Sequence, residues 1–218
     1  MIRCFTPYHL RESMPQSRKS LIIFTRFPES GKTKTRLIPA LGADGAAALQ
    51  RQMTEHTLRQ AKAFSNRYDI ALEIHFQGGD HAAMARWLGP HAFKLQASGT
   101  LGKRMNQAFA QAFAGGMTPV VLIGTDCPGL TEGGLHQAFL ALQESDLVLG
   151  PARDGGYYLI GLNEPRPFLF DDIDWGTPSV LEQTLAKANS LNVSQLAALH
   201  DIDRPQDLAH FDYHPCPQ

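Results

Sequence analysis

The sequence predicts an α/β fold of three layers, in which helices flank an open, mixed but mostly parallel sheet. Two short runs, residues 21–24 and 120–123, are apolar without alternation, which is typical of strands buried on both faces. Segments with apolar residues at helical spacing lie between and after these runs. Strands that alternate with helices favour an open sheet whose ligands bind beyond the carboxyl ends of the strands.

The first half of the chain begins with a polar segment, residues 1–19, which is interrupted by proline and has no period. We expect it to be an N-terminal extension, followed by a single domain over residues 20–218. The fold then starts with a strand at Leu21 that runs into a loop rich in proline and glycine. The next expected elements are an amphipathic helix over residues 44–64, a strand over 68–76 and a short helix over 81–89.

The second half predicts a further alternation of helices and strands. Helices are expected over residues 100–114, 132–143 and 178–189, with a short one after Arg204, and strands over residues 120–123, 146–150, 155–162 and about 193–199. The strands over 146–150 and 155–162 have no helix between them, so we expect part of the sheet to be antiparallel.

Composition limits the classes of function. The 218 residues are 43% hydrophobic and 19% charged, enough for a core without disulfides. The net charge of -1 provides no global positive field, which argues against a nucleic-acid partner. Three widely spaced cysteines, Cys4, Cys127 and Cys216, indicate a reducing compartment. No apolar run approaches about 20 residues, so we expect a cytoplasmic protein without a membrane span.

The loop after the first strand is rich in cationic side chains. Arg26, Lys32, Lys34 and Arg36 surround Gly31, but the loop is not a Walker A motif, because position 26 is Arg where that pattern requires Gly. Arg binds phosphate with two parallel hydrogen bonds and Lys provides a point charge. The loop therefore predicts a site for the phosphates of a nucleotide, and a merely solvated loop is the alternative.

A carboxylate follows the second apolar strand. Asp126 lies in a Gly- and Pro-containing turn, residues 124–130, where a hard cation such as Mg²⁺ or Mn²⁺ would take one or two carboxylates together with phosphate oxygens. The alternatives are an Asx turn or a cap on the helix near Thr131. Cys127 next to it is better explained as a small packed side chain, because no base can be assigned to it.

Residues 150–161 form a third motif, in which Gly155 and Gly156 permit close backbone approach, while Asp154 offers a carboxylate and Tyr157 a ring face. Such a loop would hold an acceptor, or it is simply a turn between two strands. Trp175, in an acidic loop, is a candidate for stacking on a sugar or base.

Asp203 precedes Arg204 and Pro205. It is interpreted either as a helix N-cap or as a second metal-binding carboxylate. His210 and His214 are four residues apart, but a zinc site there is disfavoured near a fraying terminus.

Together the motifs resemble one family. The matching residues are Pro28, Gly31, 34–37, 124–130, 150–152, 154–162, Trp175, 177–178, 180–181 and 201–203. They are similar to the DUF2064 proteins, glycosyltransferase-A-like enzymes regarded as nucleotide-diphospho-sugar transferases, some linked to arsenosugar biosynthesis. The resemblance runs from about residue 21 to residue 208. It departs at Ser30, where the family usually has a second proline, and at Arg26, where Lys is common.

The resemblance implies a nucleotide-diphospho-sugar transferase (GT-A) fold, with the nucleotide at the first strand and its loop and with Asp126 at the metal position. The leading hypothesis is glycosyl transfer from a nucleotide-sugar to a small-molecule acceptor. In it, Asp126 and Asp203 hold Mg²⁺ or Mn²⁺, and Asp154 orients or deprotonates the acceptor.

Two alternatives stay open. The first is nucleotidyl transfer from an NTP to a phosphorylated small acid, since the chain also resembles guanylyltransferases of cofactor assembly at the basic loop and at residues 201–203. The second is a noncatalytic nucleotide-binding module.

Overall fold

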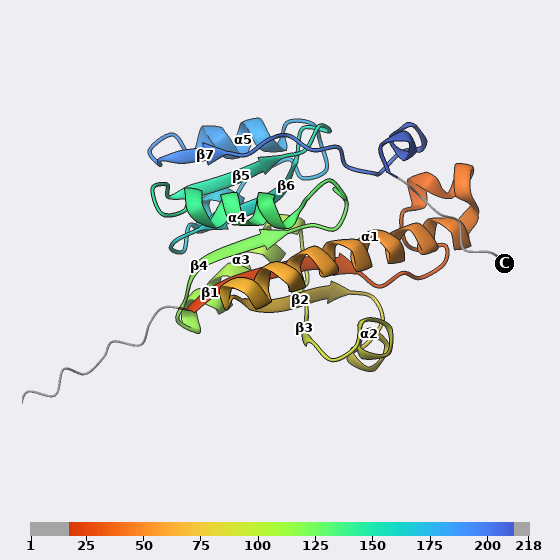
Figure 1. The fold of residues 1–218 in the computed structure, drawn as a ribbon. Helices are drawn as coiled ribbons and strands as arrows, with labels where there is room; N and C mark the ends of the chain where they lie inside the picture. Colours follow the sequence, from red (N-terminus) through yellow and green to blue (C-terminus); the bar gives the residue numbers. More distant parts are fainter. Residues whose placement is uncertain (1–17, 212–218) are drawn as a thin grey trace, which may run out of the picture.

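The computed structural model describes residues 18–211. Its centre is a seven-stranded sheet with the order β3-β2-β1-β4-β6-β5-β7 (Figure 1). The strands are β1 Arg18–Arg26, β2 Ala71–Gln77, β3 Ala92–Leu95, β4 Met117–Ile123, β5 Leu147–Pro151, β6 Tyr157–Leu162 and β7 Val193–Gln195.

The sheet is mixed, as the sequence predicts. Strands β1, β2, β3 and β4 are parallel neighbours, and β5 pairs with β7 in parallel. Strand β6 runs antiparallel to both β4 and β5, which confirms the expectation for the two strands that have no helix between them.

Helices cover both faces of the sheet. The α-helices are α1 Ile38–Tyr68, α2 His81–Leu88, α3 Leu101–Ala114, α4 Glu132–Ala141 and α5 Val180–Lys187, and the 3-10 helices are η1 Thr35–Leu37, η2 Pro167–Phe170 and η3 Pro205–His210. Helices α1 and α4 pack on one face, and α3 and α5 pack on the other.

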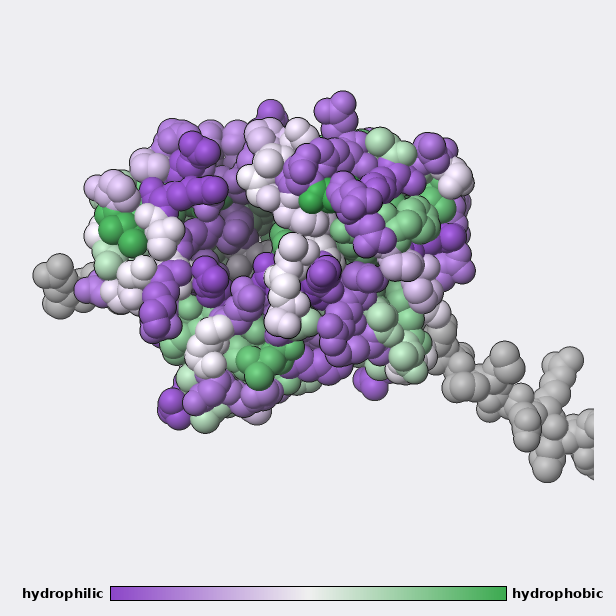
Figure 2. Space-filling model, turned by 180° about the vertical axis from the view of Figure 1, so that it is seen from behind, coloured by the Kyte–Doolittle hydropathy of each residue, from purple (hydrophilic) through white to green (hydrophobic). Residues whose placement is uncertain are grey.

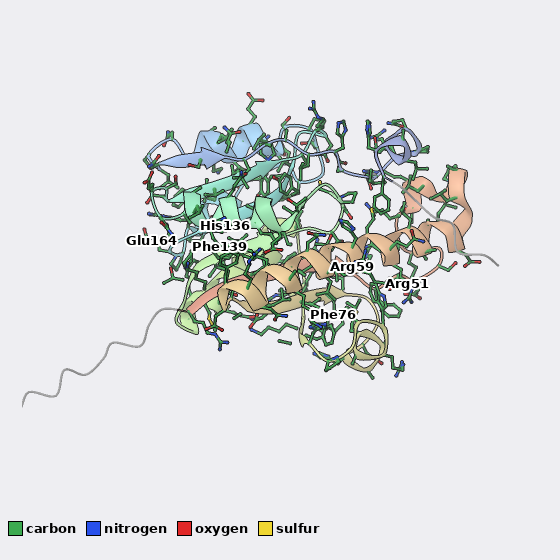
Figure 3. The ribbon with its side chains drawn as sticks, viewed as in Figure 1. Arg51, Arg59, Phe76, His136, Phe139 and Glu164 are labelled. Carbon is green, nitrogen blue, oxygen red and sulfur yellow. The ribbon has the colours of Figure 1, made fainter. Side chains whose placement is uncertain are left out.

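Strand β1 shows why its apolar run does not alternate with polar residues. Leu21 and Ile23 point into the core under α1 and α4, while Ile22 and Phe24 point into the core under α3, since successive side chains of a strand face opposite ways. On the α1 face, Phe139 of α4, labelled in Figure 3, packs against α1, where its ring centroid lies 5.4 Å from that of Phe64. The three-layer α/β prediction is thereby confirmed.

Several boundaries differ from the sequence-based expectations. Strand β1 begins at Arg18, so residues 18 and 19 belong to the sheet and not to the extension. Strand β3 was not expected, because four residues at the edge of a sheet carry little periodic signal. Strand β7 ends at Gln195, beyond which Leu199 makes only an isolated bridge.

Within residues 18–211, no helix has the length and apolar character needed to cross a membrane.

Candidate active site

A cavity of about 570 Å³ opens at the carboxyl ends of the strands. Its wall is formed by the end of β1, the loop before η1, the turn after β4, the β5–β6 turn, the first turn of α3 and residues 201–203. Figure 2 shows a hollow on the back of the molecule, bordered mainly by hydrophilic residues. The cavity lies where an open α/β sheet binds its ligands.

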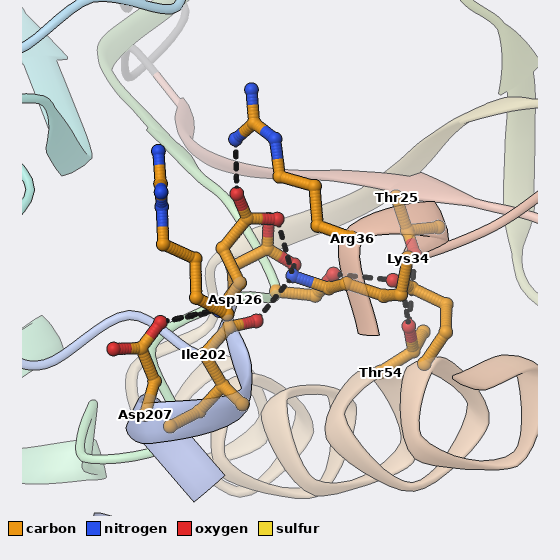
Figure 4. Close-up of polar contacts among 11 residues, drawn as sticks. Thr25, Lys34, Arg36, Thr54, Asp126, Ile202 and Asp207 are labelled. Atoms are coloured by element: carbon orange, nitrogen blue, oxygen red, sulfur yellow. Dashed lines mark hydrogen bonds and ion pairs between the residues drawn. The ribbon is translucent and has the colours of Figure 1, made fainter. Parts of the chain in front are cut away.

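Two carboxylates meet on one lysine at the centre of this wall (Figure 4). The Nζ of Lys34 lies 3.0 Å from Oδ1 of Asp126 and 3.8 Å from Oδ1 of Asp203. It also donates a hydrogen bond of 2.6 Å to the backbone oxygen of Ile202. The Lys34 side chain is only 5% exposed, whereas that of Asp126 is 52% exposed, so Asp126 remains open to a ligand.

Arg36 completes a cluster of four charges. Its guanidinium donates to Oδ2 of Asp203, and this hydrogen bond, together with the carboxylate's charge, raises the pKa of Arg36. Two positive and two negative side chains therefore balance in this cluster. Any further cation bound here would leave a net positive site that matches an anionic diphosphate.

Neither aspartate caps a helix. The N-cap of α4 is Thr131, whose own hydroxyl accepts from the backbone N–H of Gly134. At η3, the carboxylate of Asp207 accepts from the backbone N–H groups of Asp203 and Arg204. The capping interpretations of Asp126 and Asp203 are therefore wrong, and both carboxylates face the cavity.

The donor set suits a hard divalent cation that is completed by a ligand. Among the residues that the structure describes, no group of three or more His, Cys, Asp or Glu side chains converges on one point. Asp126 and Asp203 do converge, because both lie within 3.8 Å of one ammonium group. Mg²⁺ typically takes one or two carboxylates and completes its shell with water and substrate phosphates, so the two aspartates fit such an ion.

A buried polar network fixes the floor of the cavity. The Nε2 of Gln50 lies 3.4 Å, 3.1 Å and 3.3 Å from the hydroxyl oxygens of Thr25, Thr54 and Thr125. Thr25 and Thr54 also share a hydrogen bond of 2.9 Å. The network joins the end of β1, helix α1 and the turn after β4, and Thr125 is the residue immediately before Asp126. The network therefore restricts the position of the Asp126 carboxylate.

The predicted acceptor residues divide between the cavity and its support. Asp154, Gly156, Tyr157 and Trp175 line the cavity. The Oδ1 of Asp154 accepts from the backbone N–H of Gly156 at 2.8 Å, and the rings of Tyr157 and Trp175 meet edge to face at 6.3 Å. Gly155 lies behind the wall: it has φ 93°, and a Cβ there would come within 2.1 Å of the Pro178 carbonyl oxygen. Its role is to let two loops pass closely.

The basic loop does not act as one cluster. Lys32 forms an ion pair with Glu29 at 2.6 Å, and neither Lys32 nor Gly31 belongs to the cavity wall, which Arg26, Lys34 and Arg36 do line. The Lys32 side chain lies on the outside of the turn, where its ion-pair partner is only three residues away. The local sequence does not show whether a loop lysine faces the cavity or the solvent.

Several polar residues of the wall were not predicted as site residues, among them Gln50, Gln96, Arg104 and Asp201. Arg104 lies in the first turn of α3, where a basic residue is unusual because of the helix dipole, and that position was the available signal. Burial and the neighbouring charge of Asp154 raise the pKa of Asp201.

Burial likewise raises the pKa of the Cys127 thiol, which suits a packed side chain better than a nucleophile. His210 stacks on His200, and His214 lies outside the described residues.

The fold and the cavity place the chain in a class. The mostly parallel seven-stranded sheet with flanking helices is the fold of nucleotide-diphospho-sugar transferases and nucleotidyltransferases. Residues 44–177 match the family DUF2064, described as an uncharacterized protein conserved in bacteria. The chain belongs to this family.

Three known proteins illustrate the relationship. A Desulfovibrio desulfuricans G20 protein, provisionally described as a nucleotide-diphospho-sugar transferase, is 38% identical with a TM-score of 0.82, over 88% of this chain and 85% of that one. Phosphoenolpyruvate guanylyltransferase of Chloroflexus aggregans is 28% identical over 147 residues, which are 63% of this chain and 70% of the relative. The Mycobacterium tuberculosis protein Rv0371C, solved with manganese, is 16% identical with a TM-score of 0.54, over 89% and 98% of the two chains, and shares the fold.

Proposed function

We propose that the protein is a metal-dependent glycosyltransferase, which moves a sugar from a nucleotide-diphospho-sugar to a small-molecule acceptor. The observation that carries the proposal is the convergence of Asp126 and Asp203 on Lys34, at 3.0 Å and 3.8 Å, inside the cavity at the strand ends. The relative at 38% identity, provisionally described as a nucleotide-diphospho-sugar transferase, supports the choice of donor. The manganese complex of a protein with the same fold supports the choice of metal.

In this proposal Asp126 and Asp203 hold Mg²⁺ or Mn²⁺. Such an ion, when bound, supplies positive charge that stabilises the leaving diphosphate. Arg26, Lys34 and Arg36 line the same cavity and contribute charge to the nucleotide's phosphates. Gly31 and Lys32, which the sequence also indicated, lie outside the wall and do not contact the nucleotide in this proposal.

Asp154 is the proposed acceptor base. Its Oδ1 is held by the N–H of Gly156, which leaves Oδ2 to accept the proton of an acceptor hydroxyl. The acceptor oxygen forms the new bond to the sugar as the bond from the sugar to the diphosphate oxygen breaks. Gly156, Tyr157 and Trp175 border this part of the cavity, where an aromatic ring can stack on a sugar face.

A second function, nucleotidyl transfer, is favoured by one observation, the 28% identity to a phosphoenolpyruvate guanylyltransferase. In that reaction the acceptor's phosphate attacks the α-phosphate of an NTP, and pyrophosphate leaves. The same carboxylate pair would serve both reactions, because each requires stabilisation of a leaving diphosphate.

The products separate the two reactions. The protein is incubated with panels of nucleotide-sugars and NTPs and candidate acceptors, with Mg²⁺ or Mn²⁺, and the released phosphates are identified by chromatography. Release of a nucleoside diphosphate from a nucleotide-sugar supports glycosyl transfer. Release of pyrophosphate from an NTP contradicts glycosyl transfer and supports nucleotidyl transfer. Ligand binding without turnover across both panels would leave the noncatalytic module as the function.

A further inference from the structure

The cavity wall carries four cationic side chains, and only two of them have carboxylate partners. Lys34 and Arg36 pair with Asp126 and Asp203. Arg26 and Arg104 also line the cavity, but within residues 18–211 neither of them makes an ion pair. Arg26 ends β1 and Arg104 lies in the first turn of α3. The wall therefore contains a second group of positive charge, the Arg104 corner, made of Arg26, Gln96 and Arg104.

The two guanidinium groups of this corner lie close enough to repel each other. Burial lowers the pKa of Arg104, and the charge of Arg26 lowers it further. Two like charges on a partly buried wall, neither of them paired with a carboxylate, attract an anion. The first turn of α3 contains no acidic residue, so the positive end of the helix dipole adds to the same field.

Gln96 fixes the position of Arg104. The Nη1 of Arg104 donates to Oε1 of Gln96 at 2.6 Å. The Nε2 of Gln96 in turn donates to the backbone oxygens of Thr25 at 3.2 Å and His75 at 2.9 Å. Because both ends of this amide are used, Gln96 ties Arg104 to the carboxyl ends of β1 and β2 and holds its guanidinium in place before a ligand arrives.

The other edge of the Arg104 guanidinium lacks an acceptor. Its Nε is buried and has no hydrogen-bond partner, and in the described part of the chain its Nη2 has none either. Nε–H and Nη2–H donate in parallel from one edge, and their spacing matches two oxygens of a phosphate or carboxylate. A buried donor without a partner is unfavourable, and an anion that reaches this edge after a small shift of the side chains covering Nε removes that cost.

We propose that Arg104, together with Arg26, forms a phosphate-binding subsite that is separate from the Asp126–Asp203 pair and does not require a metal. The inference goes beyond the proposed reaction, since it holds for glycosyl and nucleotidyl transfer alike. The phosphate belongs either to the nucleotide donor or to a phosphorylated acceptor.

The test measures binding of inorganic phosphate to the full chain in EDTA by calorimetry. Arg104→Gln removes the paired donors and should weaken binding by about tenfold or more, the loss expected for one charge-assisted hydrogen-bonding group. Arg104→Lys keeps the charge without the paired edge and should fall between Arg104→Gln and the unmodified protein. Arg86→Gln removes a surface charge on α2 and should leave binding unchanged.

Two results would overturn the proposal. They are unchanged binding in Arg104→Gln and an equal loss in Arg86→Gln. Should Arg104→Gln fail to fold, Arg26→Gln on the exposed end of β1 gives the same reading, with weaker binding expected. If the proposed function is wrong, the unmodified protein will show no metal-dependent nucleotide binding. Its binding of inorganic phosphate in EDTA, and the loss in Arg104→Gln, would be unaffected.

A competition experiment identifies the source of the phosphate. Phosphate binding is measured again in the presence of Mn²⁺ and a saturating nucleoside diphosphate. Displacement assigns the subsite to the donor's own phosphates, and simultaneous binding assigns it to a phosphorylated acceptor.

Discussion

Asp126 is the residue on which the proposed metal site depends most. It is half exposed and faces the cavity, and its Oδ1 already attracts a cation, the ammonium of Lys34 at 3.0 Å. Its backbone is fixed, because its carbonyl accepts from the N–H of Ile202 at 2.8 Å and the preceding Thr125 contacts Gln50. A substitution at Asp126 therefore changes the carboxylate with little change in the chain around it.

Asp126→Asn keeps the size of the side chain and removes its charge. We expect Mn²⁺-dependent binding of a nucleoside diphosphate to weaken by more than the roughly 10–100-fold lost when a residue that only orients a metal ligand is changed. Titration calorimetry with and without EDTA measures the difference. Asp171→Asn, an exposed aspartate outside the cavity, is the matched control. Equal affinities for Asp126→Asn and the unmodified protein would remove the metal from Asp126.

Lys34→Met tests whether Lys34 acts as an internal cation in the ligand-free protein. Methionine has similar length but no charge, so Asp126 and Asp203 lose the ammonium that they share. We expect free Mn²⁺ to bind about tenfold more tightly to the variant, which corresponds to about 1.4 kcal/mol of binding free energy. The gain is modest because a partly exposed ion pair contributes little energy. Electron paramagnetic resonance of free Mn²⁺ gives the affinity without any turnover. Weaker Mn²⁺ binding in the variant would show that Lys34 does not compete with the metal.

At the scale of elements, the β5–β6 turn is held by close backbone contact. Gly155 has φ 93° and would place a Cβ within 2.1 Å of the Pro178 oxygen, in a conformation that favours glycine. Its N–H donates to Ala152 and its carbonyl accepts from Leu181, so it connects the turn to α5. The glycine pair predicted to contact an acceptor thus contains one member, Gly155, whose contacts are structural.

Gly155→Ala should lower the free energy of unfolding by about 1–3 kcal/mol or more, because it adds both backbone strain and a steric clash. Urea denaturation monitored by circular dichroism measures this change. Gly133→Ala in α4 is the control, since its Cβ meets only Thr131 Oγ1 at 3.6 Å and alanine is the better helix former. A Gly155→Ala protein as stable as the unmodified one would contradict the packing described here.

Strands β2 and β3 carry a pH-dependent contact away from the cavity. Glu73 accepts from Nε2 of buried His75 at 3.0 Å and pairs with Lys94 on β3. The hydrogen bond from His75, followed by the contact with Lys94, lowers the pKa of Glu73 from 4.5 to about 2 against the opposing effect of burial. Because the folded pKa is depressed, the carboxylate stabilises the fold above pH 4.5 and loses this effect as the pH falls toward 2.

Glu73→Gln should therefore be less stable than the unmodified protein at pH 7, by about 1–3 kcal/mol. The gap should narrow as the pH falls from 4.5 toward 2. Urea unfolding at a series of pH values follows both proteins. A gap that is constant across this range would mean that the Glu73 charge does not contribute.

Elements with a strong local pattern could be predicted, and those without one could not. Strands β1 and β4 were evident from unbroken apolar runs, and α3 from its period. Strand β3 is four residues long and depends on pairing with β2 for its existence. The meeting of Lys34 with Ile202 spans 168 positions and follows from the path of the chain, so motif reading could name Lys34 and Asp203 but not their contact. Arg104 belongs to no motif, and only the folded wall reveals it.

At the scale of the whole molecule, charge is balanced overall and divided locally. The chain has a net charge of -1, and the cavity wall contains both Arg26 and Arg104 and the four acidic residues Asp126, Asp154, Asp201 and Asp203. Pairing is therefore uneven: Lys34 and Arg36 pair with Asp126 and Asp203, whereas within residues 18–211 the other two aspartates and the two arginines make no ion pair. A wall of this kind suits a ligand that has several anionic groups, one of them bridged by a metal.

The central claim is that one cavity holds a metal-bridged diphosphate between Asp126 and Asp203. A crystal structure of the protein soaked with Mn²⁺ and a nucleoside diphosphate, with the ion located by anomalous scattering, tests it most directly. The account predicts that the ion would be coordinated by a carboxylate oxygen of both aspartates and by phosphate oxygens, with Lys34 displaced from between them. An ion bound elsewhere, or a diphosphate bound away from this pair, would contradict it.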